Sequence, residues 1–385
     1  MPDTRVRETF GVEELACCLS HYDLGIVLGI KEFARGSRRA PKIILDCQKG
    51  RFLFKRRNKG VEEIKKVAFT HQIQLRLAEQ NFPLPHLLGT REDNNSMLVL
   101  HDRIYEMQEY IVGAIYDGTR AATEQGGHAL GLYHKLLMDF ESDFEPVTAS
   151  YHNARAIHQS IQKTAGALKP QLENNQPLRD TIVFLQNAYY SCAETVNNLG
   201  LRDWPTQIVH GDWHPGNMLF RDHLVVAVID YDTARLQQRV IDLANGALQF
   251  SIVGGGDNPV DWPDHLDMDR FGRFLTGYDS VNVITTDELR AIPHLMCEAM
   301  IAEAAVPIAQ TGVFGRFEGG AFLTMIHKKI QWIFDHMQEL VDVLTEVIPD
   351  DGQYVPQAEP VDLSQMEKDR QENNGEDAEE EETPK

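Results

Sequence analysis

Three polar residues in the middle of the chain have types and spacing that suit phosphoryl transfer. Asp212 precedes Asn217, and Asp230 follows at the end of the apolar run 224–229. Transfer of a phosphoryl group from a nucleotide needs one carboxylate beside the attacking hydroxyl. It also needs an amide oxygen and a second carboxylate that bind Mg²⁺ on the phosphates. The three residues therefore predict a catalytic Asp212 and a metal site at Asn217 and Asp230.

Short strands must bring these residues together. The stretches 207–209, 218–220 and 224–229 indicate three strands, and the glycines and proline after the first keep the segment that follows it from being helical throughout. Asn217 and Asp230 are then expected at neighbouring strand ends. A plainer alternative is a turn whose Asp, His and Asn side chains only cap backbone groups. We favour the site, because a turn has no need of Asp230 on a separate strand.

The same block resembles a known superfamily. It contains H-G-D-x-H-x-x-N at 210–217, I-D-x-D at 229–232 and D-L-A at 242–244, and its His, Asp and Asn follow the order of a protein kinase catalytic loop. In this it is similar to the aminoglycoside phosphotransferase, choline kinase and homoserine kinase superfamily, which has a protein-kinase-like fold. The resemblance is specific in this block and weaker over the rest of Tyr22 to Glu346.

The resemblance implies an α+β, two-lobed protein-kinase-like fold, with a small antiparallel β-sheet N-lobe with one helix and a larger, mainly helical C-lobe. It also implies an ATP-dependent phosphotransferase that uses ATP and Mg²⁺. The acceptor would be a hydroxyl of a small molecule such as an amino alcohol, an amino acid or a sugar. Asp212 would orient that hydroxyl and take its proton late. Supporting roles are expected for His210, Asp232 and Asp242, the last as an anchor of the loop at a helix start.

Lys55 is the expected phosphate-binding cation of the N-lobe. It ends a short strand, 51–55, whose alternation places it on the face opposite Phe52 and Phe54. In the family, a lysine on the third strand of this lobe holds the α- and β-phosphates. A solvated basic turn is the alternative.

The acid that pairs with Lys55 is left open. Helical periodicity runs over 61–80, and in the family this helix supplies a glutamate that pairs with the strand lysine. No acid stands near Thr70 and His71, where it is expected, and the acids at 62–63 lie about two turns earlier. The pairing is therefore shifted or missing. His71 lies on the inward stripe and is expected to be a core histidine with a satisfied ring rather than the lysine's partner.

Two further segments are expected to contact the nucleotide. The loop 34–41 contains Gly36 but no G-x-G-x-x-G, and Ser37 in it is expected to donate to phosphate, with a plain basic hairpin loop as the alternative. The hinge between the lobes would hold adenine through backbone N–H and C=O groups, with an edge strand as the alternative. The hinge positions are Gln108, Glu109, Tyr110 and Ile111.

Composition limits the partners of the chain. The formal net charge of −21 over 385 residues leaves no general basic face for nucleic acid or an anionic membrane. No secretory signal and no apolar run of membrane-spanning length are evident, so the cytoplasm is the expected compartment. Five scattered cysteines indicate reduced thiols.

The chain is expected to divide into four parts. These are an N-terminal helical extension at 1–21, a nucleotide-binding lobe at 22–112, a catalytic and substrate-binding lobe at 113–348, and a disordered acidic tail at 349–385. The tail is expected to solubilise the protein, and contact with another protein is the alternative. Within the C-lobe, the glycine-rich segment 251–265 is expected to be a flexible loop. Three helices follow at 271–278, 287–308 and 320–347.

Two other functions stay open. D-x-D and A-R within 230–235 also resemble the bacterial stress-response protein kinases of the same superfamily, whose acceptor would be a protein Ser or Thr. A non-catalytic kinase-like module that binds nucleotide or a partner is favoured by the missing helix glutamate and the acidic tail. The complete set of Asp212, Asn217 and Asp230 favours an enzyme. The acceptor site is expected within 251–317, where the sequence has no recognisable chemical signature.

Overall fold

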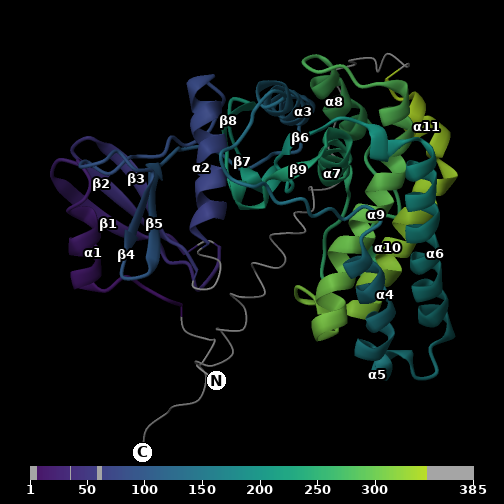
Figure 1. The fold of residues 1–385 in the computed structure, drawn as a ribbon. Coiled ribbons are helices and arrows are strands. Elements are labelled where there is room, and N and C mark those ends of the chain that lie inside the picture. Colours follow the sequence, from purple (N-terminus) through teal and green to yellow (C-terminus); the bar gives the residue numbers. More distant parts are fainter. Residues whose placement is uncertain (1–6, 35, 59–62, 345–385) are drawn as a thin grey trace, which may run out of the picture.

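The computed structural model of the protein describes residues 7–34, 36–58 and 63–344. They form a small lobe on an antiparallel sheet and a larger, mainly helical lobe, with helix α2 (Ile64–Glu79) between them (Figure 1). The α+β, two-lobed architecture expected from the sequence is confirmed. The acidic tail expected at 349–385 lies outside the described residues.

The N-lobe is built on a sheet of strand order β1-β2-β3-β5-β4, in which every neighbouring pair is antiparallel. Its strands are β1 (Val27–Glu32), β2 (Lys42–Cys47), β3 (Gly50–Arg56), β4 (Met97–Leu100) and β5 (Arg103–Glu109). Buried and half-buried positions alternate along β2 and β3, as in a sheet that packs a core on one face. β3 contains the strand expected at 51–55 and extends it by one residue at each end.

The two faces of this sheet have different tasks. One face carries Phe54, which is fully buried and packs with Cys18 of helix α1 (Val12–Leu19). Lys55 leaves the sheet on the opposite face, as the alternation predicted. The described part of the segment expected as an extension, 1–21, therefore includes the helix that covers the N-lobe core.

The C-lobe is a helical body with α9 at its centre. α9 contacts α4, α6, α7 and α10, while α3 packs against α8 so closely that a Cβ at Gly127 or Gly277 would collide with the backbone of the other helix. The helices are α3 (Arg120–Leu136), α4 (Arg155–Ala167), α5 (Lys169–Leu172), α6 (Gln176–Asn198), α7 (Arg239–Ser251), α8 (Met268–Asp279), α9 (Thr286–Thr311), α10 (Gly319–Asp335) and α11 (Met337–Asp342).

The expected helices 271–278 and 287–308 are confirmed as parts of α8 and α9, but the helix expected over 320–347 is divided. The first part is α10, which ends at Asp335, and the second is α11, which begins at Met337. Between them, the ring of His336 bonds through Nδ1 to the carbonyl oxygen of Trp332 (2.8 Å). A side chain that takes a backbone carbonyl in this way competes with helix continuation.

Helix α9 is long and apolar enough to cross a membrane by length and composition, alone among the described helices. The expectation that no apolar segment has this length is therefore wrong for α9. Its best window has a mean hydropathy of 1.3, and 78% of that window is buried inside the protein. A largely apolar and buried helix fits the centre of a helical lobe.

Two small antiparallel ribbons carry the residues that the sequence singled out. β6 (Thr206–Val209) pairs with β9 (Arg235–Gln238), and β7 (Met218–Arg221) pairs with β8 (Leu224–Val228). The sequence did not predict β9. A third ribbon, β10 (Val313–Phe314) with β11 (Phe317–Glu318), lies away from this group.

The segment 251–265, expected to be a flexible loop, is tied to the lobe by a buried cation. The Nζ of Lys329 on α10 donates to the carbonyl oxygens of Val253 (2.7 Å), Pro263 (2.6 Å) and His265 (3.3 Å). Burial lowers the pKa of this lysine to about 8. The sequence could not show this tie, because the lysine comes from a helix far along the chain.

Candidate active site

The segment after β6 is held in place by one buried carboxylate. Asp242, in the first turn of α7, accepts hydrogen bonds from the backbone N–H groups of His210 (2.9 Å) and Gly211 (3.0 Å). Its Oδ2 also lies 3.3 Å from Nε2 of His134 on α3. Gly211 has a φ of +78°, a left-handed conformation that favours glycine. This is the geometry that the predicted anchoring role of Asp242 requires.

His210 is the buried ring behind this loop. Its Nε2 donates to the carbonyl oxygen of Ile229 (3.2 Å), and the rings of Trp213 and Tyr231 lie 5.4 and 5.3 Å away. Burial lowers the pKa of His210 below its ordinary value of 6.5, so the ring is uncharged at neutral pH. A neutral, enclosed ring supports the loop and is not exposed to a bound acceptor.

Burial of neutral His210 predicts a stability that depends on pH. Its pKa is lower in the folded than in the unfolded chain, so the free energy of unfolding decreases as the pH falls below 6.5. We expect the stability difference between wild type and His210→Gln to be largest at neutral pH and to shrink toward about pH 5. Urea unfolding at a series of pH values measures it. A difference that does not change with pH would contradict the neutral ring.

Asp212 carries a partly exposed carboxylate with two donors on one oxygen. Its side chain is 38% exposed, and its Oδ2 lies 3.0 Å from Nδ2 of Asn217 and 3.5 Å from Nε2 of His214. Nδ1 of His214 accepts from the N–H of Gly216 (3.0 Å), which leaves the proton of a neutral ring on Nε2. Burial raises the pKa of Asp212, but interactions with His214, and smaller ones with His210 and Asn217, outweigh burial and hold the pKa at about 2. So weak a base acts by orientation more than by basicity.

Asn217 and Asp230 lie at adjoining ends of β7 and β8, as the sequence predicted. The N–H of Ile229 donates to the backbone carbonyl oxygen of Asn217 (2.9 Å), next to the ladder pair of Met218 and Val228. Asp230 has a left-handed φ of +66°. Among the described residues, none forms a hydrogen bond or ion pair with its exposed carboxylate.

This donor set fits Mg²⁺. The ion prefers oxygen ligands and is usually held by one or two carboxylates together with phosphate oxygens of a substrate. Asp230 offers its carboxylate, and Asn217, whose Nδ2 faces Asp212, offers its amide oxygen. In the part of the chain that the structure describes, no group of three or more His, Cys, Asp and Glu side chains could hold a metal. A metal at these two residues would therefore depend on oxygens of the nucleotide as well.

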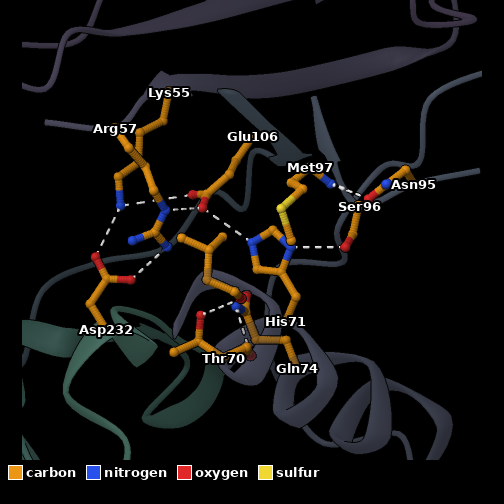
Figure 2. A network of polar contacts seen from close by, with 11 residues as sticks. Lys55, Arg57, Thr70, His71, Gln74, Asn95, Ser96, Met97, Glu106 and Asp232 are labelled. Carbon is orange, nitrogen blue, oxygen red and sulfur yellow. Dashed lines mark hydrogen bonds and ion pairs between the residues drawn. The ribbon is translucent and has the colours of Figure 1, made fainter. Parts of the chain in front are cut away.

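Lys55 belongs to a network of charges between the lobes (Figure 2). Its Nζ lies 3.4 Å from Oδ2 of Asp232 in the C-lobe and 3.9 Å from Oε2 of Glu106 on β5. Arg57 donates to the same two carboxylates, through Nη2 to Asp232 (2.7 Å) and through Nε to Glu106. Burial lowers the pKa of Lys55, but Asp232 and Glu106 outweigh it and raise the pKa above its ordinary value. The lysine is thus charged, and Asp232 reaches it from the opposite lobe.

The acid beside Lys55 comes from strand β5, and α2 contributes none. Glu63, at the start of α2, forms an exposed ion pair with Lys66 (2.8 Å), and Glu62 lies outside the described residues. The sequence analysis did not single out Glu106. It also gave no role in this network to Arg57. Only the register of β3 and β5 brings residue 106 opposite residue 55, and a hydrophobic pattern does not specify which strands pair.

Ser37 lies in the turn between β1 and β2. The last pair of the β2–β3 ladder at this end joins Lys42 to Lys55, so the turn lies at the end of the sheet that carries the lysine. The Oγ of Ser37 accepts from the N–H of Arg39 (3.3 Å). Its contact with phosphate stays a prediction.

The expected hinge begins at the end of β5, the strand that carries Glu106. Gln108 and Glu109 end β5, and the N–H groups of Glu109 and Tyr110 donate to the carbonyl oxygens of His86 and Arg51, each at 2.9 Å. These two donors are therefore engaged within the protein. An adenine bound here would rely on carbonyl oxygens and on Ile111, whose N–H has no backbone partner within the described residues.

A cavity of about 180 Å³ opens beside Asp212. Polar side chains from three elements line it: Arg235 and Gln237 of β9, Asn245 of α7, and Glu303 of α9. Glu303 lies within 251–317, where the acceptor site was expected, but no sequence pattern singles it out, because only the packing of α9 against α7 brings it to the cavity.

Two opposite charges on the cavity wall are held by hydrogen bonds. Arg235 donates through Nε to the carbonyl oxygen of Thr233 (2.8 Å) and through Nη1 to that of Ala149 (3.3 Å), and no described carboxylate pairs with it. Glu303 accepts from Nε2 of Gln249 (2.9 Å). A guanidinium and a carboxylate thus line the same cavity as the carboxylate of Asp212.

The model of the family described as "Phosphotransferase enzyme family" matches residues 29–284, well over half of the chain. The chain belongs to this phosphotransferase family. The matched region runs from β1 to the end of α8, so it contains every site residue predicted from the sequence, from Ser37 to Asp242. Glu303 lies beyond it.

Relatives and solved structures extend the match over most of the phosphotransferase. Homoserine kinase of Beijerinckia indica is 24% identical over 301 residues, 76% of this chain and 82% of the relative. Homoserine kinase of Methylocella silvestris is 23% identical over 296 residues, covering 73% and 80%. The structure of a microcompartment-associated aminopropanol kinase has a TM-score of 0.62 at 12% identity, with 86% of this chain and 99% of that one covered. An amicoumacin kinase in complex with AMP-PNP and Ca²⁺ has a TM-score of 0.60 at 12% identity, covering 84% and 93%. These structural likenesses show a shared fold.

Proposed function

We propose that this phosphotransferase is an ATP- and Mg²⁺-dependent kinase that transfers the γ-phosphate of ATP to a hydroxyl of a small polar molecule. The observation that carries the proposal is that Asp212 contacts Asn217 on one side and lines the cavity of Arg235 and Glu303 on the other. A carboxylate between a predicted metal site and an acceptor cavity is what in-line transfer to a hydroxyl requires.

In this mechanism Asp212 accepts a hydrogen bond from the acceptor hydroxyl and aims its oxygen at the γ-phosphorus. The new P–O bond forms as the bond from the γ-phosphorus to the bridging oxygen of ADP breaks, and Asp212 takes the hydroxyl proton late. A loose transition state needs position more than basicity, which suits a carboxyl pKa of about 2. Lys55 would bind the phosphates. Mg²⁺, held by Asn217 and Asp230, would neutralise phosphate charge when bound.

The size and charges of the cavity favour a small acceptor. Its volume of about 180 Å³ is below the roughly 300–1,000 Å³ of pockets for drug-sized ligands, which disfavours an aminoglycoside or a protein chain. Arg235 suits a carboxylate of the acceptor, and Glu303 suits an ammonium group. Homoserine, the substrate in the names of two relatives, has a hydroxyl, a carboxylate and an ammonium group. We infer that a hydroxy amino acid of this kind is the acceptor.

The test of the proposed function is acceptor-dependent formation of ADP by the full chain with Mg²⁺ and ATP. The acceptors are homoserine, aminopropanol, choline, an amino sugar, methylthioribose and a generic protein. We expect turnover on homoserine and the least on protein. Turnover on protein alone would instead favour a protein kinase of the stress-response type. Nucleotide binding without turnover on any acceptor would favour the non-catalytic module.

Arg235→Gln should change the choice of acceptor. Losing a charge-assisted hydrogen bond to a carboxylate should raise the KM for homoserine about 10-fold or more, while aminopropanol, which has no carboxylate, should be used as before. Steady-state kinetics with both acceptors measures the split. Arg290→Gln is the matched control, since this guanidinium on α9 is exposed and pairs with Asp287 (3.2 Å). Equal losses with both acceptors would assign Arg235 to local structure and contradict carboxylate binding.

A further inference from the structure

Lys55 and Glu106 are paired by the sheet itself. β3 and β5 are antiparallel neighbours, and residues 55 and 106 lie directly opposite in their ladder. Side chains that face each other across such a ladder leave the sheet on the same side, and here Nζ is 3.9 Å from Oε2. The pairing is therefore set by strand register and not by the position of α2.

The carboxylate of Glu106 is fixed by its other partners (Figure 2). It is buried, and its Oε1 accepts from Nε of Arg57 and lies 3.1 Å from Nε2 of His71. Nδ1 of His71 lies 2.8 Å from Oγ of Ser96, so this is the core histidine with a satisfied ring that the sequence predicted. Helix α2 thus supplies the residue that holds the carboxylate, and β5 supplies the carboxylate.

Glu106 is the counter-charge that the N-lobe itself contributes to this network, beside the nearer carboxylate of Asp232 from the C-lobe. Burial raises its pKa, but the charges of Lys55 and Arg57 and the hydrogen bond with His71 outweigh this and hold the pKa well below its usual range. The other negative charge, Asp232, is 40% exposed and belongs to the opposite lobe. Without Glu106, Lys55 and Arg57 would share a single carboxylate, that of Asp232 in the C-lobe. No acid of the sheet would then direct Lys55.

We propose that Glu106 is the positioning residue that directs Lys55 at the phosphates of the nucleotide, the task that the family gives to a glutamate of the helix. This inference rests on the proposed function, because it concerns the hold of Lys55 on phosphate. Since both residues belong to neighbouring strands, a shift of α2 does not carry the acid away from the lysine. The lysine is oriented before the nucleotide arrives.

The test compares binding of Mg²⁺·AMP-PNP and of adenosine to the full chain by calorimetry. Glu106→Gln should weaken Mg²⁺·AMP-PNP about 10-fold or more, as expected for a disturbed charge-assisted phosphate contact. Adenosine, which has no phosphate for Lys55, should bind as to wild type. In a Lys55→Met background, Glu106→Gln should cause no further loss, because Glu106 acts through the lysine. Should Glu106→Gln not fold, Glu106→Asp replaces it, with a smaller loss of the same selectivity.

Asp46→Asn is the matched control. This carboxylate lies on β2 of the same sheet, is 45% exposed and pairs with Arg51, so its loss should change neither affinity. Unchanged Mg²⁺·AMP-PNP affinity in the Glu106 variant would overturn the positioning role. So would a loss of equal size in the Lys55→Met background. A wild-type chain that binds no Mg²⁺·AMP-PNP would instead overturn the proposed function, and the positioning role with it.

Discussion

Asp212→Asn should remove most phosphate transfer and leave nucleotide binding intact. We expect kcat with the best acceptor to fall by about 100- to 10,000-fold, the range for loss of a positioned proton acceptor. An amide has the shape of the carboxylate but neither its charge nor a site for the hydroxyl proton. Asp212 is not among the residues assigned to the nucleotide, so the Kd for Mg²⁺·AMP-PNP should stay close to that of wild type. Steady-state kinetics and calorimetry on the same preparation measure both quantities.

Asp222→Asn is a suitable control for this change. Asp222 is exposed in the turn between β7 and β8 and has a left-handed φ of +51°, which Asn adopts as readily as Asp. It removes a carboxylate from the same segment without touching the site. If the kcat of Asp212→Asn were as high as that of Asp222→Asn, Asp212 would not be the residue that orients the acceptor.

Asp242→Ala should cause the largest loss of stability among the site residues. The N–H of His210 would lose its acceptor in a buried place and that of Gly211 in a half-buried one, and an unsatisfied buried donor costs about 1–3 kcal/mol. With two such donors and the lost partner of His134, we expect the free energy of unfolding of the C-lobe to fall by about 3 kcal/mol or more. Urea unfolding followed by tryptophan fluorescence measures it, since Trp213 lies in the same loop.

The matched control for Asp242 is Asp287→Ala. Asp287 is also an acid in the first turn of a helix, but its side chain is 56% exposed and pairs with Arg290. An exposed pair of this kind contributes about 0–1 kcal/mol. If the two variants lost similar stability, Asp242 would be an ordinary helix-start acid and not the anchor of the loop before Asp212.

The structure weakens one argument for a non-catalytic module. That alternative was favoured by the missing helix glutamate, which suggested a lysine without an acid. Glu106 lies beside Lys55 in the network, so a carboxylate is present although it comes from another element. Asn217 and Asp230 also adjoin at the ends of β7 and β8, as an enzyme would need.

Predictions from the sequence were most accurate for structural features that lie within a single segment of the chain. The block 210–232 contains its own strands, loop and ligands, so its local order predicts that Asn217 and Asp230 adjoin. Alternation within β3 likewise predicts which face carries Lys55, because side-chain direction along a strand follows from its pleat. The division into a sheet lobe and a helical lobe followed from periodicity together with the resemblance.

Features that depend on pairing between distant segments could not be predicted. Glu106 meets Lys55 only through the register of two strands, and Glu303 reaches the cavity only because α9 packs against α7. Lys329 ties the segment 251–265 from a helix far along the chain. Each case is a contact between segments whose own patterns are satisfied in many other arrangements.

The most direct test of kinase activity follows the γ-phosphate itself. The full chain is incubated with Mg²⁺, homoserine and ATP that is isotopically labelled in its γ-phosphate, and the products are identified by mass spectrometry. We predict that the label appears in a phosphorylated acceptor in the same amount as ADP, and that Asp212→Asn forms almost none. Label that stays in ATP or passes only to inorganic phosphate, in a chain that binds Mg²⁺·ATP, would contradict a kinase of this acceptor.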